Sequence, residues 1–173
     1  MIIIKNIHID MHTRYFQRGT STVAFKDINS EWEKGLYITE LTKQWVKENF
    51  PKSDALLHSS IISLGIKNII PEINIITICN DEQFETVRNY LILLHPELEG
   101  KIFKFKKTED RKNSYADYTA TKMARAILKI KNIHRDRGFN LSEVNFLELH
   151  NLLKKLNERS RAQSGSTVSP IQR

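Results

Sequence analysis

Apolar and polar positions alternate in short stretches along the first part of the chain. Residues 1–10 begin with a β-branched run and continue as alternating apolar and polar positions, which predicts a strand ending on Asp10. A second strand is predicted over residues 20–28, antiparallel to the first across a long hairpin, and a third begins at 35–38. Residues 39–50 are ambiguous, because a strand-like start precedes apolar residues at helical spacing.

Helices and strands alternate along the rest of the chain. The expected order is a helix over 53–64, a strand over 73–79, a helix over 82–94, a strand over 101–107 and a long helix over 114–133. An additional amphipathic C-terminal helix is expected within residues 139–159, beginning near Leu141, and a flexible polar tail over 160–173. Three antiparallel strands followed by this alternation predict an α/β protein with a mixed five-stranded sheet flanked by helices.

The composition is that of a folded domain. Of the 173 residues, 40% are hydrophobic and 27% are charged, which argues against intrinsic disorder. No apolar run is long enough to span a bilayer, and no secretory leader is recognised at the N-terminus. The single Cys79 cannot form a disulfide within the chain or a thiolate zinc site. A cytoplasmic protein is therefore expected.

The net charge of +7 is concentrated in one segment. Residues 101–138 contain 12 Lys and Arg but 4 Asp and Glu, a local charge of +8, whereas the rest of the chain contains 15 and 16. Clustered cations bind nucleic-acid backbones through counterion release. A nucleic-acid partner is therefore expected beside the most clustered of these residues, Lys104, Lys106, Lys107, Arg111 and Lys112.

Three acidic residues stand where this architecture would bring them together. Asp10 ends the first predicted strand, Asp81 follows the strand over 73–79, and Asp117 stands in the first turn of the long predicted helix. Ends of neighbouring strands lie close in space, and carboxylate oxygens are the ligands that Mg²⁺ takes. Each acid taken alone also fits a strand end or helix start, where Asp is common. The order of all three predicts a metal site for phosphodiester cleavage.

Four parts of this chain resemble the ribonuclease H type 1 family. Residues 75–84 are similar to the family strand that ends in an Asp followed by a polar residue, Gln and an aromatic residue. Residues 102–105 followed by 113–117 resemble its fifth strand, then an Asn, three residues and the last catalytic Asp. Residues 7–10 resemble its first strand, and residues 53–64 its first long helix.

The resemblance implies a ribonuclease H-like domain over residues 1–136. Its implied activity is a Mg²⁺-dependent (or Mn²⁺-dependent) endoribonuclease that cleaves the RNA strand of an RNA:DNA hybrid or acts on another duplex. Asp10, Asp81 and Asp117 would then bind the metal and activate the attacking water. Such a fold also hosts other nucleases, so it does not determine the substrate.

The chain departs from the family pattern at three places. After Asp10 the chain has Met11 and His12, where the family usually has a Gly. If residues 53–64 are the family helix, Leu56 occupies the position of the catalytic Glu. Glu40 supplies that carboxylate only if its own, earlier segment is the true family helix. The loop before Asp117 also has no His. The alternative is a catalytically degenerate domain that binds nucleic acid or a protein partner, with the C-terminal helix as a docking element. A basic regulatory protein of unrelated fold remains the third reading.

Overall fold

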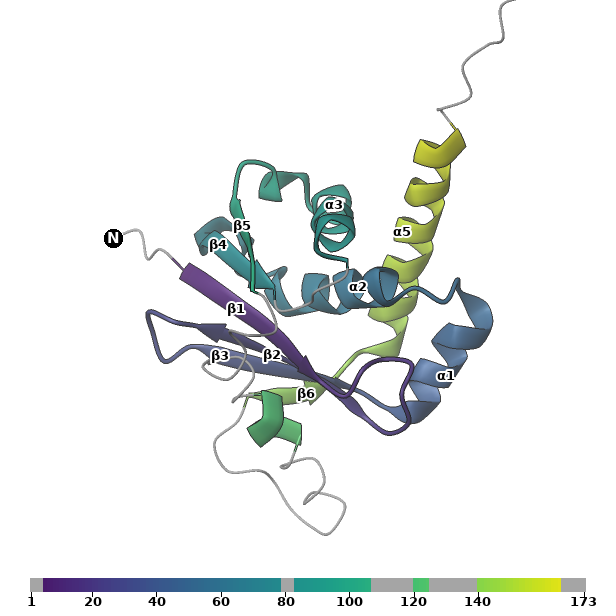
Figure 1. The fold of residues 1–173 in the computed structure, drawn as a ribbon, viewed down its shortest axis with the longest axis horizontal. Coiled ribbons are helices and arrows are strands. Elements are labelled where there is room, and N and C mark those ends of the chain that lie inside the picture. Colours follow the sequence, from purple (N-terminus) through teal and green to yellow (C-terminus); the bar gives the residue numbers. More distant parts are fainter. Residues whose placement is uncertain (1–4, 79–82, 107–119, 125–139, 166–173) are drawn as a thin grey trace, which may run out of the picture.

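The computed structural model describes residues 5–78, 83–106, 120–124 and 140–165, and they form a mixed sheet with helices against it (Figure 1). The six strands stand in the order β5-β4-β1-β2-β3-β6. They are β1 (Lys5–His12), β2 (Ser21–Asp27), β3 (Glu33–Ile38), β4 (Ile73–Ile78), β5 (Ile102–Phe105) and β6 (Leu141–Glu143). The first three pair antiparallel, β4 pairs parallel with β1, and β5 pairs parallel with β4.

The predicted mixed α/β sheet flanked by helices is confirmed, but the prediction of five strands is wrong. The sixth strand, β6, pairs parallel with β3 where the C-terminal helix was expected to begin. Backbone bonds from the Gly35 N–H to Asn140 and from the Val144 N–H to Tyr37 extend this pairing. A strand of three residues contains too few positions for its alternation to be distinguished from the start of an apolar helical stripe.

The helices are α1 (Glu40–Asn49), α2 (Asp54–Ile66), α3 (Phe84–Leu94) and α5 (Phe146–Gly165), with short 3-10 turns at Ile70–Glu72 and Pro96–Leu98. The ambiguous segment is therefore helical. Thr39 and Ser53 cap the N-termini of α1 and α2, because each side-chain oxygen accepts a bond from a backbone N–H in the first turn. Residues 160–165 belong to α5 and not to a polar tail, and residues 166–173 lie outside the described residues.

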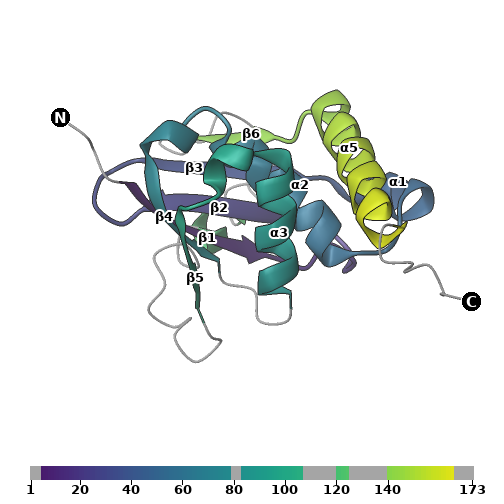
Figure 2. The same cartoon turned by 90° about the horizontal axis from the view of Figure 1, so that it is seen from above.

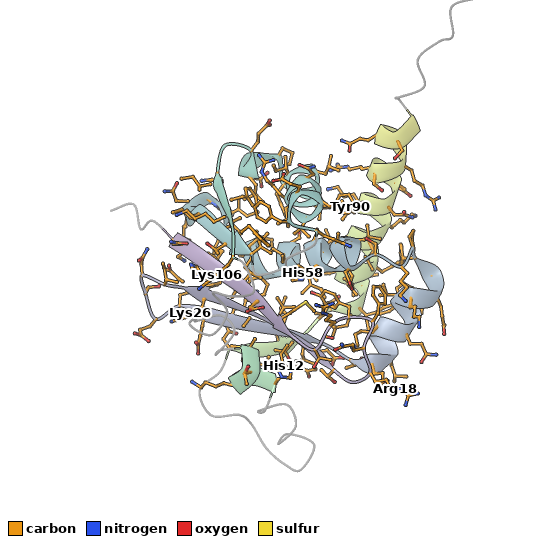
Figure 3. All side chains as sticks on the ribbon, in the orientation of Figure 1. His12, Arg18, Lys26, His58, Tyr90 and Lys106 are labelled. Atoms are coloured by element: carbon orange, nitrogen blue, oxygen red, sulfur yellow. The ribbon has the colours of Figure 1, made fainter. Side chains whose placement is uncertain are left out.

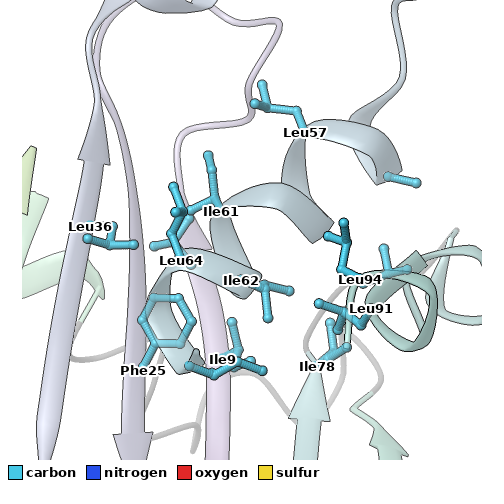
Figure 4. Packing of buried hydrophobic residues seen from close by; sticks show 14 of the residues in the cluster. Ile9, Phe25, Leu36, Leu57, Ile61, Ile62, Leu64, Ile78, Leu91 and Leu94 are labelled. Atoms are coloured by element: carbon cyan, nitrogen blue, oxygen red, sulfur yellow. The ribbon is translucent and has the colours of Figure 1, made fainter. Parts of the chain in front are cut away.

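One face of the sheet carries the hydrophobic core. Helices α2 and α3 cover this face, and α5 packs beside α2 (Figure 2). Ile9 and Phe25 from the sheet pack with Ile61 and Ile62 of α2 and with Leu91 of α3, and none of these side chains is exposed (Figure 4). The apolar stripe of the C-terminal helix joins the same core through Leu149, Leu153 and Leu156. This stripe therefore docks within the molecule.

None of the helices in the described part of the chain is both long enough and apolar enough to cross a membrane.

Candidate nucleic-acid interface around Asp10

Asp10 lies on the sheet face opposite the core. Alternate residues of β1 point to opposite faces, so Ile7 and Ile9 enter the core while His8 and Asp10 share the other face. Asp10 is only 4% exposed, and its Oδ1 accepts a 2.8 Å hydrogen bond from the Met11 N–H. One oxygen of this buried carboxylate is thus held in a defined place.

A row of paired residues crosses the sheet beside Asp10. Asp10 pairs with Ala24 of β2, Ala24 pairs with Gly35 of β3, and Gly35 pairs with Leu141 of β6. The helical residues 120–124 lie on this row, where Ala120 and Met123 pack with Ala24 and Leu141. A Cβ on Gly35 would lie closer than 3.0 Å to the Met123 sulfur. The small residues at positions 24 and 35 therefore let this segment reach the sheet.

The remaining two acids lie outside the described residues. Asp81 is three residues beyond Ile78, which pairs with Ile9, the residue before Asp10. Asp117 is three residues before Ala120, which contacts the row at Ala24. Among the described residues, no three His, Cys, Asp or Glu side chains group so that they could hold a metal ion. The described neighbours of all three acids therefore meet at one place on the sheet.

Two of the predicted basic residues lie in or next to β5, which β4 separates from β1. Lys104 pairs with Thr77 of β4, and the Lys106 N–H donates to the Ile78 carbonyl at 3.1 Å. Burial lowers the pKa of His8, and the positive charges of Lys106 and then Lys104 lower it further. The face that carries His8 and Asp10 is therefore electropositive at its β5 side. Lys107, Arg111 and Lys112 lie outside the described residues.

Glu40 and Leu56 occupy different environments. Glu40 is exposed in the first turn of α1, so the segment that contains it is helical. It lines a pocket between α1 and residues 15–18, and Asp10 is not among the lining residues. Leu56 is 3% exposed and packs in the hydrophobic core from the first turn of α2.

A buried polar pair joins the β1–β2 connection to α2 and was not predicted. The Tyr15 hydroxyl and His58 Nδ1 lie 2.5 Å apart in a hydrogen bond, and both side chains are buried. Burial, reinforced by the charge of Asp54, raises the pKa of Tyr15 well above its usual value. Burial lowers the pKa of His58 to about 4. The partners are 43 residues apart and carry no local sequence signal.

No protein-family model, curated protein or solved structure matches this chain.

Proposed function

We propose that this chain is a ribonuclease H-like domain that cleaves the RNA strand of an RNA:DNA hybrid with Mg²⁺ or Mn²⁺. The observation that carries the proposal is the meeting of three chain segments at the row beside Asp10. Asp10 is itself in β1, the chain leading to Asp81 leaves β4 next to Ile9, and the chain following Asp117 packs on Ala24. Three residues span at most about 11 Å, which limits how far either acid can lie from this row.

The sheet supports the same proposal. Three antiparallel strands followed by strands parallel to the first agree with the fold that the resemblance implies. The strand carrying Asp10 stands in the interior of the sheet, between β4 and β2. A carboxylate on an interior strand has neighbours on both sides, which is the arrangement that a shared metal site needs.

The proposed chemistry assigns each group a task. Asp10, Asp81 and Asp117 would hold the metal through carboxylate oxygens, the ligands that hard divalent cations prefer. A bound metal would supply Lewis-acid stabilisation of the phosphodiester oxygens and lower the pKa of an attacking water. The Met11 N–H holds one oxygen of Asp10 in place. Lys104 and Lys106, on the β5 side of Asp10, would bind backbone phosphates next to the reacting one.

A second candidate is a degenerate domain that binds nucleic acid without cutting it. The observation in its favour is that neither position considered for the fourth carboxylate places one beside Asp10. Leu56 packs in the core where the resemblance calls for a Glu, and Glu40 lines the α1 pocket. This domain would bind through the same basic residues, with affinity that falls as salt rises.

Hybrid cleavage decides between the two candidates. The full chain is incubated with a labelled RNA:DNA hybrid and Mg²⁺ or Mn²⁺, beside Asp10→Asn, Asp81→Asn and Asp117→Asn. Each substitution keeps the side-chain shape while removing the charge, and we expect each to abolish cleavage. Glu31→Gln, at an exposed site elsewhere, is the matched control and should cut normally. The nuclease proposal would be refuted if Asp10→Asn still cleaved the hybrid, or if the wild type did not cleave it.

Binding is measured separately from cleavage. The salt dependence of hybrid affinity is recorded for wild type and for Lys104→Gln combined with Lys106→Gln. Each lost phosphate contact should reduce the slope of log affinity against log salt by about 0.9. Lys154→Gln, an exposed charge on α5, should leave the slope unchanged. Equal slopes in all three proteins would remove Lys104 and Lys106 from the interface.

A further inference from the structure

A pocket of about 380 Å³ lies between α1 and the connection from β1 to β2, and we name it the α1 pocket. Its size is in the range of small-ligand sites. It is lined by Tyr15, Phe16, Gln17, Arg18, Glu40, Lys43, Gln44, Lys47 and Glu48. Figure 3 shows Arg18 next to α1, beyond the end of β1, and well apart from Lys106, which bonds to the end of β4. No residue of the Asp10 row lines the pocket, so it is a separate site.

The buried cation of the α1 pocket is Lys43. Its side chain is 4% exposed, and its ammonium donates to the Gln17 carbonyl at 2.8 Å and to Ser21 Oγ at 2.9 Å. An ammonium has three N–H donors, so these two neutral acceptors leave one donor for a ligand. Burial lowers the pKa of Lys43, although the negative charge of Glu40 opposes this effect. An anion bound in the pocket would offset the cost of burying this charge.

Two further cations stand at the exposed part of the α1 pocket. Arg18 and Lys47 are exposed, and no carboxylate in the described residues forms an ion pair with either of them or with Lys43. Glu48 is instead bonded to the side-chain amide of Gln44 at 3.0 Å. At the rim, the Lys52 ammonium lies 5.4 Å from the centre of the Phe16 ring. The pocket therefore gathers cations around a buried donor.

From this arrangement we propose that the α1 pocket binds a phosphate group through Arg18, Lys43 and Lys47. A guanidinium and two ammonium groups match the several oxygens of a phosphate, and such charge-assisted bonds are the strong ones. The phosphate is part of a small ligand such as a nucleotide or part of a nucleic-acid backbone. The proposal does not depend on hybrid cleavage, because the α1 pocket shares no lining residue with the Asp10 row.

The test is a phosphate titration of the ¹⁵N-labelled full chain, followed by amide shifts and compared with chloride at equal ionic strength. We expect saturable shifts in residues 15–18 and 40–48 with phosphate only. Arg18→Gln combined with Lys47→Gln alters exposed side chains, so it preserves the fold. It should weaken binding by about tenfold or more, because two of the three cations that contact the phosphate are removed. Lys154→Gln should bind as wild type does.

Two outcomes would overturn the proposal. One is that chloride reproduces the shifts, and the other is that the double variant binds phosphate as tightly as Lys154→Gln does. Competition identifies the source of the phosphate. Displacement by a short RNA:DNA hybrid assigns it to a nucleic-acid backbone, and displacement by a nucleoside monophosphate alone assigns it to a small ligand. Asp10→Asn should retain binding even if cleavage is absent, which separates this result from the nuclease test.

Discussion

Gly65 in α2 sets helix propensity against core packing. Alanine is the better helix former, and in an ordinary helix interior Gly→Ala stabilises by about 1 kcal/mol. Here a Cβ at position 65 would lie closer than 3.0 Å to three ring atoms of Phe25. Phe25 is 0% exposed and packs among Ile9, Ile61 and Leu64 (Figure 4), so its ring has no free volume to move into. Overpacking of this kind costs about 1–3 kcal/mol, and a rigid ring favours the upper half of that range.

The expected result for Gly65→Ala is a net loss of about 1–2 kcal/mol in the free energy of unfolding, measured by urea denaturation with far-UV circular dichroism. The control is the same substitution in a Phe25→Leu background, where the ring is absent. There the higher helix propensity of alanine should make Gly65→Ala stabilising. The double-mutant cycle should then give a coupling energy of about 2–3 kcal/mol between the two positions. A Gly65→Ala protein as stable as wild type, or a coupling energy near zero, would refute the steric reasoning.

Three more substitutions test other contacts. Because burial lowers the pKa of His58 to about 4, the unfolded state binds its proton first, and stability should fall by about 3 kcal/mol as pH drops from above 6.5 to 4. In His58→Gln the free energy of urea unfolding should fall less over the same pH range. If the variant and the wild type lose stability equally with falling pH, the reasoning is wrong. Asp27→Ala should cost about 2–3 kcal/mol in urea, because it removes the buried acceptor of three hydrogen bonds, from the Asn6 and Asn29 N–H groups and the Ser30 hydroxyl. A loss below about 0.5 kcal/mol would contradict this. Gly35→Ala should displace Met123 and shift the amides of 120–124, with Met123→Ala restoring them; unchanged amides would show that the sulfur moves freely.

Most of the architecture could be predicted because its signals are local. Alternation over β1 and the apolar run of β4 identify strands, and Ser53 marks the start of α2. That helix was expected to end at residue 64, yet α2 continues through Gly65 to Ile66, because this glycine packs closely on Phe25 and does not form a turn. A sequence pattern does not distinguish these two uses of glycine, which depend on a contact with a distant strand.

The site is only partly predictable for the same reason. Asp10 was singled out because the first strand was expected to end there, whereas β1 continues to His12. The row of residues beside Asp10 depends on strand register. No local pattern in the sequence marks Ala24 or Gly35. Their place beside Asp10 follows only from the register in which β2 and β3 pair with β1 and with each other. The pairing of Tyr15 with His58 and the α1 pocket likewise join segments far apart along the chain. Catalytic roles for Asp10, Asp81, Asp117 and Glu40 remain predictions.

The short strand β6 has a consequence for any shortened version of this protein. It covers the outer edge of β3, occupying the Gly35 N–H and the Tyr37 carbonyl on either side of it. A chain cut before Leu141 would leave that edge open, and it would also remove Leu149, Leu153 and Leu156 from the core. Open strand edges recruit other strands. Such a truncation should therefore self-associate through β3, so the C-terminal helix and its strand need to be retained when the nuclease and phosphate-binding proposals are tested.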